Sequence, residues 1–244
     1  MVQRTFRWMT GWITLGCCLV AMAFPAYAQG VDVTAKIVVR GGSGAASKTK
    51  DPGAGDVVVW LSPLQPLTTK PPVQPHGPYR LLQKDKQFSP HLLVVPTGTS
   101  VEFPNADPFF HNVFSLFNGK RFDLGLYESG TSRSVKFDRE GVSYIFCNIH
   151  PEMGAVVMSL STPYYAVSGR NGEVVIHGVQ PGSYRLQVWS EQAKVSSPNN
   201  PRDVQISAST TNLGEIDMQT MASPLADHKN KFGEDYRPSA NSPY

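Results

Sequence analysis

The chain has 244 residues, a formal net charge of +3 at pH 7 and 17% charged residues. So small a charge gives no electrostatic case for binding nucleic acid, whose phosphates select basic proteins. The length allows one large domain or two small ones. The 21 glycines and 20 prolines lie among short β-branched runs, and no long apolar stripe of the mature chain has the period of a helix, so we expect an all-β fold.

The first 28 residues have the pattern of a secretory signal peptide. Arg4 and Arg7 precede an apolar run from Trp8 to Phe24, and Ala26-Tyr27-Ala28 then supplies small residues for cleavage after position 28. The run is short for a bilayer span, and no later stretch approaches the roughly 20 apolar residues of a transmembrane helix. We therefore expect an exported mature chain, periplasmic or secreted, without a transmembrane segment.

Removal of this signal takes away Cys17 and Cys18 and leaves Cys147 as the only cysteine of the mature chain. Exported thiols normally pair, so a single one is either a buried, inert side chain or a ligand. A lipoprotein signal ending at Cys17 is the alternative to cleavage after position 28, but Thr14 stands where such signals usually have an aliphatic residue.

Residues 29–78 are predicted to form N-terminal strands and a proline-rich linker. Val31–Val39 and Asp56–Leu61 alternate or run apolar, and a loop of small residues separates them. Repeated prolines between Ser62 and Pro78 exclude a central strand there. The two strands are candidates for the first half of a flanking sandwich.

Residues 79–162 are predicted to form a sandwich or barrel of short strands, because turn signals such as Pro96-Thr97-Gly98 and Glu140-Gly141 recur between apolar runs. Arg121–Tyr127 is predicted to be a loop, in which Asp123 makes an Asx-type turn before Gly125. The predicted strands are Tyr79–Leu82, His91–Val95, Thr99–Phe103, Asn112–Phe114, Ser132–Phe137, Val142–Cys147 and Val156–Leu160.

Residues 163–219 form a third predicted segment, with a hairpin turn at Asn171-Gly172, because both residues tolerate positive φ. Residues 220–244 are polar and contain prolines, which predicts a disordered tail. The strands predicted in the third segment are Tyr164–Val167, Glu173–His177, Ser183–Trp189 and Val204–Ile206.

Four residues form a soft ligand set for one metal ion. Cys147, His150 and Met153 lie within seven residues, and His111 stands upstream beside another predicted strand. A thiolate and two imidazoles with a weak axial thioether hold copper in blue electron-transfer sites, because sulfur favours Cu(I) while imidazole also suits Cu(II). Pro151 stiffens the loop by fixing φ. The spacing favours this site over an inert thiol at Cys147.

Three segments of the chain resemble the cupredoxins, the blue copper family of plastocyanin and azurin: Phe103-Pro104-Asn105, Asp107–Val113 and Gly141–Met153. The short spacing within the last segment is similar to that of amicyanin, and the resemblance covers about residues 79–160. It implies a Greek-key β-sandwich holding one type-1 copper ion per chain, with the ligands His111, Cys147, His150 and Met153.

The resemblance also implies roles for residues around the ligands. Asn112 is expected to place its backbone amide near the Cys147 sulfur and to tie the two ligand loops together through its side chain, with an ordinary turn residue as the alternative. Phe109, Phe110 and Pro151 are expected to form an apolar rim around His150, on which redox partner proteins dock. The alternative is that at least one phenylalanine belongs to the core.

Two features depart from the family pattern. Asn148-Ile149 replaces the usual Thr-Pro or Ser-Pro after the cysteine, and Glu152 puts a carboxylate beside the site. Unless it is simply solvated, that charge is expected to favour Cu(II) and lower the reduction potential.

The stretch Gly172–Trp189 resembles the second half of a carboxypeptidase regulatory-like, transthyretin-type sandwich, and Val33–Leu61 looks like its missing first half. We therefore predict that the cupredoxin domain is inserted into one small sandwich made from both flanks, since neither flank alone buries enough core. The alternative is an N-terminal strand extension with a separate C-terminal sandwich.

The sequence thus favours an exported copper protein that carries single electrons between redox partners. It would not be an enzyme by itself, because four protein ligands leave no open position for substrate. The alternatives are copper storage or delivery, and a binding or adhesion module with incidental copper. Zinc competes with copper for such ligands, since availability decides in the cell.

Overall fold

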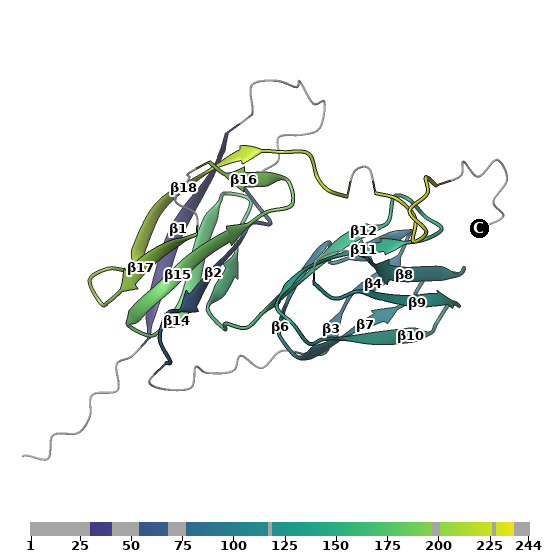
Figure 1. Cartoon of the computed structure of the whole chain (residues 1–244), viewed down its shortest axis with the longest axis horizontal. Coiled ribbons are helices and arrows are strands. Elements are labelled where there is room, and N and C mark those ends of the chain that lie inside the picture. The colour runs from purple at the N-terminus through teal and green to yellow at the C-terminus, as the bar shows by residue number, and fades with distance from the viewer. Residues whose placement is uncertain are drawn as a thin grey trace, which may run out of the picture.

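The structure, a computed structural model, describes residues 30–40, 54–67, 77–116, 119–196, 201–225 and 228–236, and the predicted signal peptide lies outside these ranges. The described residues are all-β and include no helix (Figure 1). Accordingly, none of them belongs to a helix that is long and apolar enough to cross a membrane. The strands are β1 (Val31–Arg40), β2 (Val58–Pro63), β3 (Tyr79–Arg80), β4 (Leu82–Lys84), β5 (Gln87–Ser89), β6 (Leu92–Pro96), β7 (Thr99–Pro104), β8 (His111–Ser115), β9 (Phe122–Tyr127), β10 (Ser132–Phe137), β11 (Gly141–Cys147), β12 (Gly154–Leu160), β13 (Tyr165–Val167), β14 (Glu173–Val179), β15 (Gly182–Trp189), β16 (Ala193–Val195), β17 (Arg202–Ile206) and β18 (Asn212–Thr220).

The first sandwich is built from strands β3 to β12. One sheet has the order β10-β7-β3 and the other the order β6-β12-β11-β8-β9. Alternate residues of the strands face inward, so Phe103, Phe137 and Ile145 are almost completely buried between the sheets. Strand β11 pairs with β8 on one side and β12 on the other, which places its carboxyl end at the centre of the larger sheet.

The second, smaller sandwich combines strands from both ends of the described chain. Its sheets have the orders β14-β1-β18-β16 and β13-β2-β15-β17, so β1 and β2 pair with strands that follow the first sandwich. Val33, Leu61 and Ile176 lie in one buried cluster between these sheets. The predicted all-β fold class, a β-sandwich with a second small β-sandwich, is confirmed; the domain boundaries stay a prediction.

The two sandwiches pack against each other through an apolar contact, side by side in Figure 1. Val58 and Trp60 of β2 share one buried cluster with Met158 and Leu160 of β12. Val58, Met158 and Leu160 are at most 2% exposed, and Trp60 is 8% exposed. Since buried apolar surface contributes about 25 cal/mol per Å², this contact favours one fixed arrangement of the two sandwiches.

The turn at Asn171-Gly172 differs from the predicted hairpin. Gly172 has a φ of 77°, and a Cβ there would meet the Ile37 carbonyl oxygen, so the position requires glycine. However, β13 pairs with β2 whereas β14 pairs with β1, so the turn connects strands of opposite sheets. Turn chemistry predicted the reversal of the chain, but the partner of each strand is decided by the core.

Several strands lie where the sequence predicted none. Arg121–Tyr127, predicted as a loop, contains β9, which pairs with β8 along the edge of the larger sheet. β5 closes a short hairpin with β4, and β16 and β18 extend the second sandwich. Phe122 and Leu124 of β9 are only partly buried, and the pairing with β8 places this strand in the sheet.

The predicted disordered tail is wrong for the part of it that the structure describes. Residues 228–236 lie against the first sandwich, where Lys231 and Tyr236 make hydrogen bonds and His228 stacks on Phe146. The polar composition hid these contacts because they go to backbone and amide groups rather than into an apolar core. Positions 226, 227 and 237–244 lie outside the described residues.

His91 and Glu191 form an ion pair between the two sandwiches, with 2.5 Å between Nε2 and Oε2. The hydrogen bond from His91 to Glu191 raises the pKa of His91 above 6.5, against an opposing effect of burial. Because the pKa of His91 is higher in the folded chain than in the unfolded chain, the ion pair stabilises the fold below pH 6.5. This stabilisation is lost as the pH rises through the folded-state pKa of His91.

We therefore expect His91→Gln to lower the melting temperature more at pH 6 than at pH 9. The loss should stay within about 1 kcal/mol, as for other partly exposed ion pairs. Thermal melts of both proteins at the two pH values check this, with His177→Gln, which removes the exposed pair to Asp32, as the control. An equal loss at both pH values would contradict the assignment.

Candidate metal centre

Two neighbouring strands bring the predicted ligands together. His111 opens β8 and Cys147 ends β11, and these strands pair antiparallel with Cys147 opposite Val113. After Cys147 the chain makes a tight loop, closed by hydrogen bonds from the Met153 amide to the His150 carbonyl and from the Cys147 amide to the Met153 carbonyl. The loop therefore returns His150 to the end of the strand that carries Cys147.

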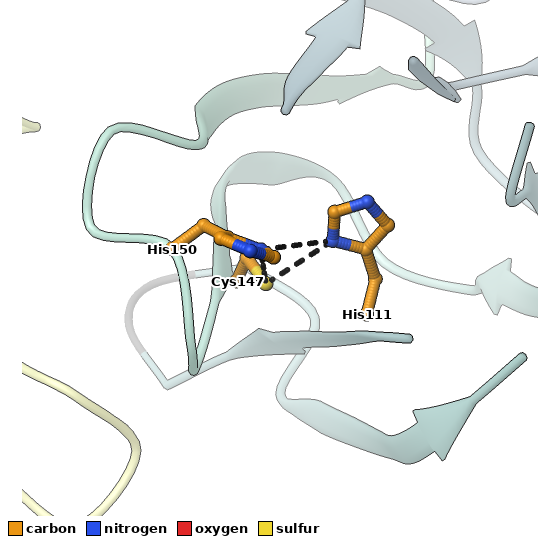
Figure 2. Close-up of side chains that lie close together, drawn as sticks. All are labelled: His111, Cys147 and His150. Atoms are coloured by element: carbon orange, nitrogen blue, oxygen red, sulfur yellow. Dashed lines mark hydrogen bonds between the residues drawn. The ribbon is translucent and has the colours of Figure 1, made fainter. Parts of the chain in front are cut away.

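The side chains of His111, Cys147 and His150 converge at one point (Figure 2). The Cys147 sulfur is 3.7 Å from His111 Nδ1 and 3.6 Å from His150 Nδ1. The two Nδ1 atoms are 3.1 Å apart. His111 and Cys147 are fully buried and His150 is 5% exposed. Within the described residues this is the one group of three or more such side chains with donor atoms close enough to hold a metal ion.

These separations fit a single metal ion. An ion about 2.3 Å from a thiolate and about 2.0 Å from each imidazole nitrogen needs roughly 3.7 Å between sulfur and nitrogen in a trigonal plane. The two sulfur to nitrogen distances, 3.6 and 3.7 Å, agree with this requirement. Nitrogen to nitrogen would be roughly 3.5 Å for such an ion, so the observed 3.1 Å requires only a small opening of the site.

Met153 lies in the same buried cluster as Cys147 and is itself fully buried. Its backbone closes the ligand loop on both sides. The structure therefore places Met153 beside the site, and its role as an axial ligand stays a prediction.

Burial is the main influence on the protonation of Cys147 and His150. Burial raises the pKa of the Cys147 thiol, although the backbone N–H groups of Ile149, Asn112 and His150 hydrogen-bond to the sulfur and oppose that shift. Burial, with the neighbouring His111, lowers the pKa of His150. At neutral pH the metal-free site therefore holds a protonated thiol and a neutral His150, and a metal ion that binds there displaces the thiol proton.

Asp107 supports the site and was not predicted to do so. Its Oδ2 atom lies 2.8 Å from His111 Nε2, so Nδ1 is the nitrogen that faces the ligands. The same carboxylate accepts hydrogen bonds from the amides of Asp85 and Lys86, at 2.6 and 3.0 Å. Asp107 is 3% exposed; burial acts to raise its pKa, but its hydrogen bonds outweigh burial and hold that pKa below its usual range.

Asn112 contacts the site partly as expected. Its backbone N–H hydrogen-bonds to the Cys147 sulfur, but its side-chain Nδ2 donates to Asp123 at 2.7 Å rather than tying the ligand loops together. The loops are joined instead by the backbone, through the Asn148 amide and the Asn112 carbonyl at 3.3 Å. Asp123 also accepts from the Gly125 amide, which is the predicted Asx turn.

Aromatic and apolar residues surround the two histidines. The Phe109 ring lies 5.3 Å from the His111 ring and 5.5 Å from the His150 ring. Phe110 is 47% exposed and Ile149 41% exposed, and Pro151 and Glu152 are also exposed. Phe109 thus covers the ligands, while Phe110 and Ile149 present apolar surface at the same end of the sandwich.

No protein-family model matches the chain, and no curated protein matches it. Among solved structures, a purple cupredoxin from Nitrosopumilus maritimus has a TM-score of 0.31 and 26% identity over 34% of this chain and 99% of its own. A copper-containing nitrite reductase from Thermus scotoductus has a TM-score of 0.34 and 23% identity, with 40% of this chain and 26% of that chain covered. A reduced Cu(I) form of an amicyanin variant has a TM-score of 0.31 and 18% identity, with 36% and 86% covered. TM-scores this low support no conclusion on function.

Proposed function

We propose that this chain is an exported type-1 copper protein that carries single electrons between redox partners. The observation that supports the proposal is the convergence of one thiol and two imidazole nitrogens, all buried, at separations that suit one ion. His111, Cys147 and His150 would hold copper, with Met153 as a weak fourth ligand. Copper in such a set carries one electron by alternating between Cu(I) and Cu(II).

The residues around the ligands are suited to fast electron exchange. Cys147 and His111 lie on paired strands, and Asp107 fixes the His111 ring through Nε2. Backbone amides hold the sulfur in place. A site held from several sides moves little between oxidation states, so little reorganisation accompanies the electron, and donors to the sulfur set the potential.

The apolar rim gives a place for a partner to approach. Phe110 and Pro151 are exposed next to ligands, and Phe109 packs on both histidine rings. We propose that redox proteins dock on this rim and exchange electrons through His150. A ligand set made only of protein side chains leaves no position for substrate, so the chain acts as a carrier rather than an enzyme.

The test is a redox titration of the mature protein loaded with Cu(II). We expect one copper ion per chain and reversible reduction by one electron, followed by voltammetry and by metal analysis after dialysis. A colourless protein that holds Cu(I) alone would favour storage or delivery. Copper binding that leaves the thiol free to react would support the incidental copper of an adhesion module, and stable retention of zinc in place of copper would contradict a redox role.

A further inference from the structure

Residues 228–236, the clamp segment, lie on the end of the first sandwich that carries the ligands. Figure 1 shows the yellow part of the chain leaving β18 in the second sandwich and reaching the first sandwich beside β8, β11 and β12. No residue of this segment belongs to either of the large buried clusters within the sandwiches. Its contacts therefore act on the loops of the site rather than on the core.

Lys231 holds both ligand-bearing parts of the site at once. Its backbone amide donates to Asn148 Oδ1 at 3.0 Å, and Asn148 follows Cys147 in the ligand loop. Its Nζ atom lies 2.8 Å from Asp123 Oδ2, and the other carboxylate oxygen of Asp123 accepts from the Asn112 side chain beside His111. One residue thus connects the Cys147 loop with the β8–β9 pair.

Tyr236 and His228 hold the end of β11. The Tyr236 hydroxyl donates to the backbone carbonyl of Cys147 at 2.8 Å. The His228 ring stacks on Phe146, with 4.1 Å between centroids and 17° between planes, and its edge meets the Tyr236 ring. The residue that bears the thiol is therefore held through its own carbonyl and through the side chain before it.

We propose that the clamp segment locks the ligand loop against β8 and β9, with Lys231 and Tyr236 as positioning residues that keep the site closed around Cys147. Closure is a property of the metal-free chain. Its redox consequence rests on the proposed function: without the Lys231 charge, the Asp123 carboxylate beside Asn112 is unbalanced, which favours Cu(II) and lowers the reduction potential.

The test measures how fast a thiol reagent modifies Cys147 in the metal-free mature chain. Cys147 is fully buried, so modification requires local opening of the loop. Tyr236→Phe removes one hydroxyl, and Lys231→Gln removes the charge. We expect the double variant to react about five- to thirtyfold faster, the effect of weakening the closed state by one or two hydrogen bonds. Lys231→Arg keeps the charge, so Cys147 in this variant should react almost as slowly as in the natural sequence.

Lys229→Gln is the matched control, because Lys229 pairs with the exposed Asp235 within the clamp segment itself. Unchanged reactivity of the double variant, within twofold of the control, would overturn the proposal. Tyr236→Phe adds no atoms, so its rate decides the matter should the double variant lose its native circular dichroism. In the copper-loaded protein, Lys231→Gln should lower the reduction potential. If Cys147 of the double variant reacts faster but the protein holds no redox-active copper, the clamp proposal is supported and the proposed function is rejected.

Discussion

Replacing Cys147 with serine is expected to abolish intense visible absorption in the Cu(II)-loaded protein. The absorption of a blue copper site comes from charge transfer between thiolate and Cu(II), and serine supplies no sulfur. Copper binding should weaken by more than the roughly 10- to 100-fold typical of losing a group that only supports a ligand. Visible spectra and competition with a copper chelator measure both effects.

The fold should survive this change, because the serine hydroxyl still accepts the amide hydrogen bonds that reach the sulfur. Ile145→Val is the matched control, since Ile145 is fully buried on the same strand. It should cost about 0.5–1.5 kcal/mol and leave the absorption unchanged. Retention of the absorption in Cys147→Ser would remove the thiolate from the site.

Replacing Asp107 with alanine is expected to damage both the site and the fold. His111 would lose the partner that fixes its ring, so copper affinity should fall about 10- to 100-fold. The backbone amides of Asp85 and Lys86 would lose their acceptor as well. These two residues form a strained turn, with positive φ of 55° and 54°. A hydrogen bond to a charged group is worth about 1.5–3 kcal/mol, so we expect the free energy of unfolding to fall by about 2–4 kcal/mol.

Denaturant unfolding of the metal-free protein and chelator competition of the copper form separate the two losses for Asp107→Ala. The control is Asp138→Ala, which removes an exposed carboxylate paired with Lys120 and should leave the free energy of unfolding nearly unchanged. If Asp107→Ala kept the copper affinity of the natural sequence, Asp107 would have no part in orienting His111.

The convergence of His111, Cys147 and His150 could be predicted because their local spacing is informative. Cys147 and His150 share one short loop, and His111 and Cys147 stand at the ends of two strands, so their convergence follows once these strands pair. Asp107 was missed because it looks like a turn residue before proline. Its role depends on the β4–β5 hairpin, some 20 residues upstream, whose contact with it no local pattern announces.

The contacts of the clamp segment could not be predicted from the sequence either. The composition of this segment is typical of disorder, and its contacts are single hydrogen bonds, from the Tyr236 hydroxyl to the Cys147 carbonyl and from the Lys231 backbone amide to the Asn148 side-chain oxygen. Each bond uses one backbone group, and every residue carries such groups, so the sequence does not mark them. The turn at Asn171-Gly172 is similar: its positive φ was predictable, but the sheet that each flanking strand joins was not.

The visible spectrum of the mature protein with one equivalent of Cu(II) tests the central claim most directly. A thiolate and two imidazoles on one copper ion predict intense absorption that disappears on reduction and returns on oxidation. A weak spectrum typical of copper bound only by nitrogen and oxygen, with Cys147 still reactive toward a thiol reagent, would contradict a copper site built from His111, Cys147 and His150.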